Sequence, residues 1–182
     1  MPTVVAILPE GFEELEAVAP IDLLRRAGAG VTIAALDDAP AVKGRNGMTL
    51  VADTTLAALE AAGGPSPDLL LLPGGPGVKS LRESELVRTW VARQAEGGRW
   101  LAAICAAPTV LHDAGLLAGR RFTAHFSVAG ELPELLAEER VVVDGRLITS
   151  RGAGTAVEFG LALVVALCGR VTADEINRSI CA

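Results

Sequence analysis

The sequence is poor in the residue types that bind nucleic acids. It has no tyrosine, four phenylalanines and two tryptophans, so few rings are available to stack on bases. The formal net charge is −6 and the pI is about 5.0, and no basic block interrupts this acidic balance. Because nucleic acids bind through positively charged surfaces, we expect no direct binding to DNA or RNA.

Cysteine and histidine are also scarce. Cys105, Cys168 and Cys181 are an odd number of cysteines without a CxxC spacing, which argues against a disulfide framework and a cysteine zinc site. The two histidines are scattered, so no metal site is expected. The first residues lack the basic region of a signal peptide, and no apolar run is long enough to cross a bilayer. These features predict a protein of the reducing cytoplasm that does not enter membranes.

Apolar residues are abundant, at 51% of the chain, and they are patterned. Strand-like runs are expected at 3–8, 31–35, 49–52, 69–72 and 100–104, and as a hairpin of 141–143 and 147–149 around Asp144-Gly145. Helices are expected at about 12–27, 84–96, 108–114, 155–167 and 174–180. This alternation predicts one α/β domain over residues 1–182, a largely parallel sheet with helices on both faces.

The first predicted helix carries an apolar face and an acidic start. Leu15, Val18, Leu23 and Leu24 are expected to form its buried face, with a kink or interruption at Pro20. The glutamates at 13, 14 and 16 lie in its first turn, where carboxylates suit the helix dipole and usually face solvent. Glu16 is the exception that we expect to point into a pocket at the sheet edge. A carboxyl held there has a raised pKa and can act as a general acid or base.

Cys105 follows the buried run 100–104 and precedes a predicted helix. At such a junction the free backbone N–H groups and the helix dipole favour an anion, which predicts a lowered thiol pKa and a reactive thiolate. The alternative is a buried cysteine that serves only as a small apolar side chain. The loops 9–11 and 73–75 are expected at the same carboxyl edge of the sheet, which favours the functional interpretation.

Two further features could complete a site around Cys105. The glycines of loop 73–77 match no phosphate-binding pattern; they either form a tight turn or present backbone N–H groups to a reacting oxygen. His125 follows a strand-like run and is the histidine that could reach the cysteine in space, whereas His112 is expected to be structural.

Five motifs in the same order resemble the DJ-1/PfpI (ThiJ/PfpI) superfamily, and specifically its DJ-1-like branch. They are ILPEGFEELE at 7–16, DLLRRAG at 22–28, LLPGG at 71–75, AAICAAP at 102–108 and TSRGAGT at 149–155. The resemblance implies a flavodoxin-like three-layer sandwich in which Cys105 occupies a strained nucleophile elbow. It implies that Glu16 hydrogen-bonds the sulfur, that Gly75 and Ala106 are the backbone donors, and that His125 is the nearby histidine.

The resemblance also implies a homodimer packed through the first helix, with Arg25 and Arg26 near the partner's pocket. Arg45 lies near the place of an arginine that the branch often carries, although Asn46-Gly47 leaves its register open. Ala153 stands where a proline is often found, and Ala106 stands where the protease-like branch has histidine, which disfavours peptidase activity.

Three functions remain in competition. The resemblance favours a cofactor-independent enzyme that acts on reactive dicarbonyls (a glyoxalase III-like activity) or on early glycation adducts of proteins and nucleotides, with Cys105 as nucleophile and Glu16 as proton shuttle. The second is a non-enzymatic sensor of oxidative stress or a chaperone, acting through a Cys105 sulfinate. A glutamine-amidotransferase-like hydrolase comes last, because it needs a carboxylate beside His125.

Overall fold

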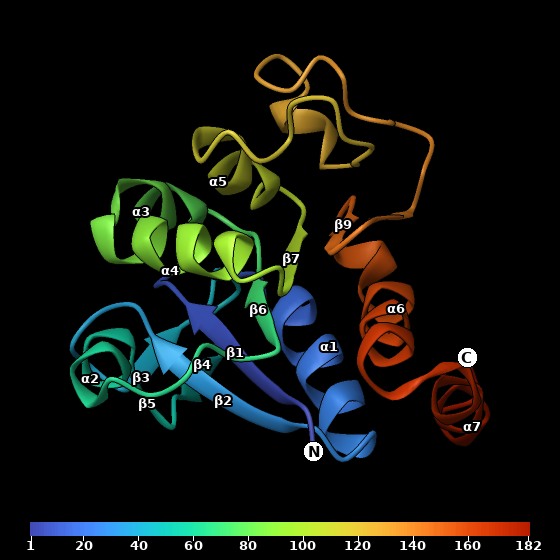
Figure 1. Ribbon diagram of the computed structural model, residues 1–182, viewed down its shortest axis with the longest axis horizontal. Helices are drawn as coiled ribbons and strands as arrows, with labels where there is room; N and C mark the ends of the chain where they lie inside the picture. Colours follow the sequence, from blue (N-terminus) through green and yellow to red (C-terminus); the bar gives the residue numbers. More distant parts are fainter.

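A seven-stranded sheet forms the centre of the computed structural model, which describes residues 1–182 (Figure 1). The strand order is β5-β2-β1-β6-β7-β9-β8, and every neighbouring pair is parallel except β9 and the edge strand β8. The strands of this sheet are β1 Thr3–Leu8, β2 Gly30–Ala35, β5 Thr54–Thr55, β6 Leu69–Leu72, β7 Trp100–Ile104, β8 Val141–Asp144 and β9 Leu147–Ser150. The predicted α/β class is confirmed.

Helices cover both faces of the sheet (Figure 1). The helices α1 Glu14–Arg26, α6 Ala156–Cys168 and α7 Arg170–Ser179 pack on one face. The other face is covered by α2 Leu56–Ala62, α3 Val78–Glu83, α4 Glu85–Glu96 and α5 Pro108–Asp113. Alternate residues of each strand enter the two cores, as Leu69 and Leu71 do on one side and Leu70 and Leu72 on the other. A continuous apolar run is therefore required in β6, because both of its faces are buried.

The hairpin outside the main sheet was predicted in part. β3 Ala41–Lys43 and β4 Thr49–Val51 pair antiparallel around the Asn46-Gly47 turn and form a separate two-stranded sheet. The short helices α2 and α3 were not predicted, and α7 starts four residues earlier than expected. Both missed helices are only one or two turns long, so their sequences contain too few periodic positions to distinguish them from loops.

The orientation predicted for α1 is wrong in its first half. Leu15 and Val18 are 58% and 44% exposed, whereas Leu23 and Leu24 are buried as expected. Pro20 lies inside the helix and does not end it. It packs where α1 meets α6: a Cβ on Gly160 would come within 3.0 Å of the Pro20 Cα, so the small residue permits this close approach. The apolar residues of α1 thus lie on two faces of the helix, one exposed and one buried. Helical periodicity alone does not show which apolar residues belong to which face.

The strand order places a switch point between β1 and β6, because the chain adds strands first on one side of β1 and later on the other. The loops after β1, β6 and β7 therefore meet at one carboxyl edge of the sheet, as expected for ligand sites in such folds. No helix of the chain is long and apolar enough to cross a membrane.

Candidate active site

Cys105 immediately follows β7 and has a left-handed backbone conformation, with φ of 64°. Two main-chain hydrogen bonds hold it there. Its N–H donates to the Ser150 carbonyl at 2.9 Å, and its carbonyl accepts from the His125 N–H at 2.8 Å. A residue other than glycine in this conformation costs about 1–3 kcal/mol, which the surrounding structure must offset. The strained elbow that the resemblance implies is present, and it holds a partly buried thiol at the sheet edge.

The sulfur of Cys105 lies among the groups expected around it. The backbone N–H groups of Ala106 and Gly75 donate to it, and the Glu16 carboxyl is its side-chain hydrogen-bond partner. All four residues line one open recess of about 420 Å³. Residues from the loops after β6 and β7 and from the first turn of α1 thus meet at one atom, although they are far apart in the sequence.

Glu16 is almost completely buried, at 1% exposure, and its environment changes its acidity. Burial raises its pKa to about 7, and the nearby carboxylate of Glu13 acts in the same direction. Its Oε2 accepts a hydrogen bond of 3.0 Å from the Gly74 N–H. The raised pKa predicted from the sequence is thus present, and a proton is available on this carboxyl near neutral pH.

The thiol behaves differently from the sequence prediction. Burial raises the pKa of Cys105 to about 12, and the ionised Glu16 carboxylate opposes a second negative charge beside it. The donors Ala106 and Gly75 favour the anion but do not outweigh these effects. The expected lowering fails because the elbow that exposes the thiol to N–H groups also buries it next to an acid. The two groups therefore share a single charge, which is located on the carboxylate or on the sulfur according to which one holds the proton.

Gly74 is a site residue that the sequence reasoning missed. A Cβ at this position would lie 2.6 Å from the Cys105 Cβ and would overlap Glu16 Oε2. No side chain fits between the thiol and its acid, and the Gly74 N–H is needed as a donor to that acid. The signal was present in the paired glycines of the loop, but the backbone donors were assigned only to Gly75 and Ala106.

The three glutamates of α1 have separate roles, and none lies on a solvated face, contrary to the general expectation for Glu13 and Glu14. Glu13 caps the helix, because its Oε2 accepts from the Glu16 N–H at 2.9 Å. Glu14 accepts from the backbone and side-chain nitrogens of Asn46 at 2.7 and 2.9 Å. Burial opposes its charge, but these N–H donors hold the pKa of Glu14 below its ordinary value. This buried carboxylate attaches the tip of the β3–β4 hairpin to α1.

The hairpin tip forms one wall of the recess. Arg45 and Asn46 line it, and the Arg45 N–H donates to the Phe12 carbonyl at 2.9 Å. The register that the sequence left open is thereby decided, since Arg45 is on the same recess as Cys105. Its guanidinium is exposed at the mouth, and its positive charge favours ionisation of Glu16.

His125 lines the same recess, but its ring is held by another residue. The Ser127 N–H donates to Nδ1 at 3.3 Å, and the Ser127 hydroxyl lies 2.8 Å from the same nitrogen. The neutral ring therefore carries its proton on Nε2. Burial and the charge of Arg45 lower the pKa of His125, which keeps the ring neutral. Nδ1 contacts no carboxylate, so the site lacks the acid of a Cys–His–acid triad.

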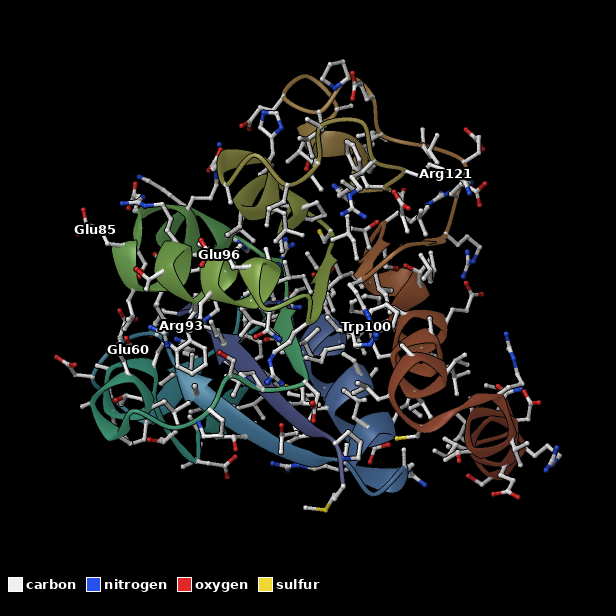
Figure 2. The ribbon with its side chains drawn as sticks, in the orientation of Figure 1. Glu60, Glu85, Arg93, Glu96, Trp100 and Arg121 are labelled. Carbon is white, nitrogen blue, oxygen red and sulfur yellow. The ribbon has the colours of Figure 1, made fainter.

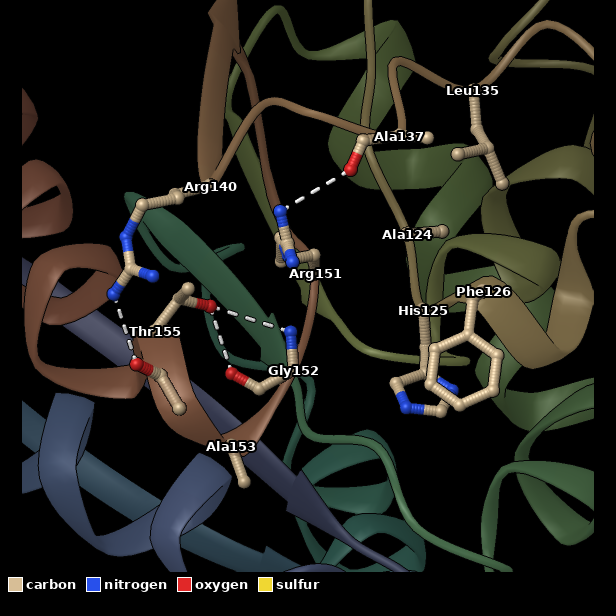
Figure 3. Close-up of a pocket in the computed structure, with 11 residues that line it drawn as sticks. Ala124, His125, Phe126, Leu135, Ala137, Arg140, Arg151, Gly152, Ala153 and Thr155 are labelled. Carbon is tan, nitrogen blue, oxygen red and sulfur yellow. Dashed lines mark hydrogen bonds between the residues drawn. The ribbon is translucent and has the colours of Figure 1, made fainter.

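A second recess of about 380 Å³ adjoins the first, and His125 and Ala153 line both (Figure 3). The exposed ring of Phe126 lies against His125, with 4.1 Å between ring centroids and a tilt of 36°, and Thr155 holds the Gly152 backbone (Figure 3). His112, by contrast, is exposed on α5 and lines a different recess, away from Cys105. No cluster of three or more side chains suited to a metal is present.

Comparison with known proteins places this chain in a family. Residues 2–166 match the DJ-1/PfpI family. Protein dj-1beta of Drosophila melanogaster is 39% identical over 178 residues, which are 96% of this chain and 94% of that protein. Protein DJ-1 homolog A of Arabidopsis thaliana is 40% identical over 96% of this chain, but the chain spans only 45% of that longer protein. A protein of Caenorhabditis elegans named glutathione-independent glyoxalase DJR-1.2 is 35% identical over 95% of this chain and 92% of its own length.

The fold agrees with the sequence match. The crystal structure of Drosophila melanogaster DJ-1beta superposes with a TM-score of 0.92 at 37% identity, covering 100% of this chain and 98% of that one. The flavodoxin-like sandwich implied by the five motifs is therefore confirmed. With the family match over most of its length, the chain belongs to the DJ-1/PfpI family.

Proposed function

We propose that this protein is a cysteine enzyme without a cofactor that converts reactive dicarbonyls, such as methylglyoxal and glyoxal, or removes early glycation adducts from proteins and nucleotides. One observation carries the proposal: a thiol held at a strained elbow among two backbone donors and a carboxyl that gains and loses a proton near neutral pH. The relative named a glutathione-independent glyoxalase supports the same chemistry.

The geometry suits a sequence of proton transfers between Cys105 and Glu16. The sulfur attacks the aldehyde carbon of methylglyoxal as its proton passes to the Glu16 carboxylate. Glu16 then gives that proton to the aldehyde oxygen, which leaves a hemithioacetal on Cys105 and a free carboxylate. Glu16 then moves a proton from that carbon to its neighbour through an enediol, which leaves a thioester on Cys105. Water releases lactate and restores the thiol; glyoxal gives glycolate in the same way. The N–H groups of Gly75 and Ala106 stabilise the charge that develops beside the sulfur.

Lactate release from methylglyoxal without glutathione tests this function. Cys105→Ser and Glu16→Gln should each reduce the rate by at least about a hundredfold, because each removes a group that the proton transfers require. Retention of full activity in either variant would exclude the mechanism. His125→Ala measures whether the histidine contributes beyond lining the recess, where its Nε2 proton is free to donate to substrate.

A second candidate is a sensor of oxidative stress or a chaperone that acts through Cys105. Two peroxide molecules would each transfer one oxygen to the sulfur and leave as water, which gives a sulfinate. The position of the protonated Glu16 carboxyl favours this candidate, because it could donate a hydrogen bond to a sulfinate oxygen. Mass spectrometry after mild peroxide treatment distinguishes the two: stable gain of two oxygens on Cys105 without dicarbonyl turnover supports the sensor.

We also propose that the protein is a homodimer packed through α1 in a reducing cytoplasm. Leu15 and Val18 of α1 and Met48 and Val51 of the hairpin are exposed by 58%, 44%, 63% and 72%. A second copy would cover these side chains. Arg25 already pairs within its own chain with Asp53, so a role in the partner's pocket would require it to leave that contact. The three free cysteines agree with a reducing compartment.

A further inference from the structure

Arg82 lies outside the recess but makes three charged hydrogen bonds behind it. Its Nε and Nη2 donate to the two carboxylate oxygens of Asp113 at 2.7 and 3.0 Å, and its Nη1 donates to Glu131 Oε2 at 2.9 Å. The Arg82 and Asp113 side chains are only 30% and 31% exposed. A forked, partly buried arrangement of this kind is among the stronger ion-pair geometries.

Each of the three residues ends a short segment that begins in the active site. The segment 75–82 starts at the donor Gly75 and becomes α3, and the segment 105–113 starts at the nucleophile and becomes α5. The segment 125–131 starts at the histidine of the recess and turns through a 3₁₀-helix. One guanidinium therefore joins the far ends of three of the segments that line the recess.

The path from Arg82 back to the sulfur is short and hydrogen-bonded. The Val78 N–H donates to the Gly75 carbonyl at 3.1 Å, and the Thr109 hydroxyl donates to the Ala106 carbonyl at 2.7 Å. The donors on Cys105 are the N–H groups of those same residues, Gly75 and Ala106. A shift of α3 relative to α5 would therefore change the direction of both donors with respect to the sulfur.

We propose that Arg82 is a positioning residue that, through Asp113 and Glu131, holds the loops of Gly75, Cys105 and His125 in the relative placement that stabilises the sulfur anion. The inference rests on the proposed function only in the experiment that measures lactate release. It concerns the acidity and reactivity of Cys105, which alkylation measures whether or not the protein converts dicarbonyls.

The experiment compares the pH profile of Cys105 alkylation by iodoacetamide in the native protein and in Arg82→Gln. We expect the rate near neutral pH to fall about tenfold, since misdirected donors no longer favour the sulfur anion. The midpoint should stay near pH 7, because Glu16 sets the pH at which the pair loses its proton. Arg82→Lys keeps the charge but loses the fork and should recover only part of the rate. Lactate release should fall in parallel if the proposed function is correct.

The matched control is Arg93→Gln. Arg93 forms a similar two-bond pair with Glu60, at 2.7 and 3.0 Å, between α4 and α2 and away from the recess (Figure 2). It should leave the alkylation profile unchanged even where it lowers thermal stability. If Arg82→Gln does not fold, Asp113→Asn and Glu131→Gln each remove one arm, and the first should lower the alkylation rate more than the second. An unchanged profile in folded Arg82 or Asp113 variants would overturn the inference, even if turnover is lost.

Discussion

Replacing Glu16 with glutamine should raise the stability of the protein relative to the native chain more at neutral pH than at mildly acidic pH. In the native protein burial raises the pKa of Glu16 from 4.5 to about 7. The folded state therefore holds this proton more tightly than the unfolded state does. The stabilisation that results is fully present below about pH 4.5 and is lost as the pH rises through about 7.

The rise in pKa corresponds to about 3 kcal/mol of unfolding free energy, because each pKa unit is worth about 1.4 kcal/mol. Glutamine is neutral at every pH, and its amide oxygen can still accept from the Gly74 N–H. The difference in unfolding free energy, Glu16→Gln minus native, should therefore increase by about 3 kcal/mol between pH 4.5 and 7 and then remain level.

Urea denaturation of both proteins from about pH 3.5 to about pH 8.5 measures this difference, in which the titrations of groups remote from Glu16 cancel. Glu14→Gln is the internal contrast, because N–H donors hold the pKa of Glu14 below its ordinary value of 4.5. Its carboxylate stabilises the fold above pH 4.5, and that stability is lost as the pH falls. Glu14→Gln should therefore destabilise the protein. The difference in unfolding free energy, Glu14→Gln minus native, should fall as the pH rises, opposite to Glu16→Gln, and it should do so at more acidic pH. A difference for Glu16→Gln that does not change with pH would refute the burial argument.

Three further predictions follow from the same contacts. Alkylation of Cys105 should follow a midpoint near pH 7, where its shared proton leaves the pair, and Glu16→Gln should abolish that midpoint because the thiol then titrates alone. Gly74→Ala should destabilise the protein by about 1–3 kcal/mol and block alkylation, whereas Gly64→Ala, where an added Cβ meets nothing, should do neither. Leu15→Glu should halve the mass measured by light scattering if α1 forms the dimer contact; an unchanged mass would place the contact elsewhere.

The sequence was sufficient to predict the longer strands and the long helices, but not the short strands β3 and β5. Apolar residues repeat with the period of each element, and β6 is apolar at every position because helices cover both of its faces. The position of Cys105 at a strand end, and hence at the ligand-binding edge of the sheet, follows from the same pattern. Glu16 and His125 were candidates from the residues themselves, but Gly75 and Ala106, and the contact of Glu16 with the sulfur, required the additional comparison of five motifs with a family.

Only the tertiary structure decided what each side chain contacts. Glu13, Glu14 and Glu16 are near neighbours in the sequence, yet one caps a helix, one holds the hairpin tip and one faces the thiol. Their directions depend on loops brought together by the sheet, over separations of up to 89 residues, between Glu16 and Cys105.

The acidity of Cys105 also could not be predicted from the sequence. The sequence places the thiol beside free N–H groups and predicts a lower pKa, but folding also buries it against Glu16, and burial has the larger effect. Local periodicity follows from neighbours along the chain, and so it can be read from the sequence. Desolvation and the sharing of a proton depend on atoms from distant segments, and only the folded structure brings those atoms together.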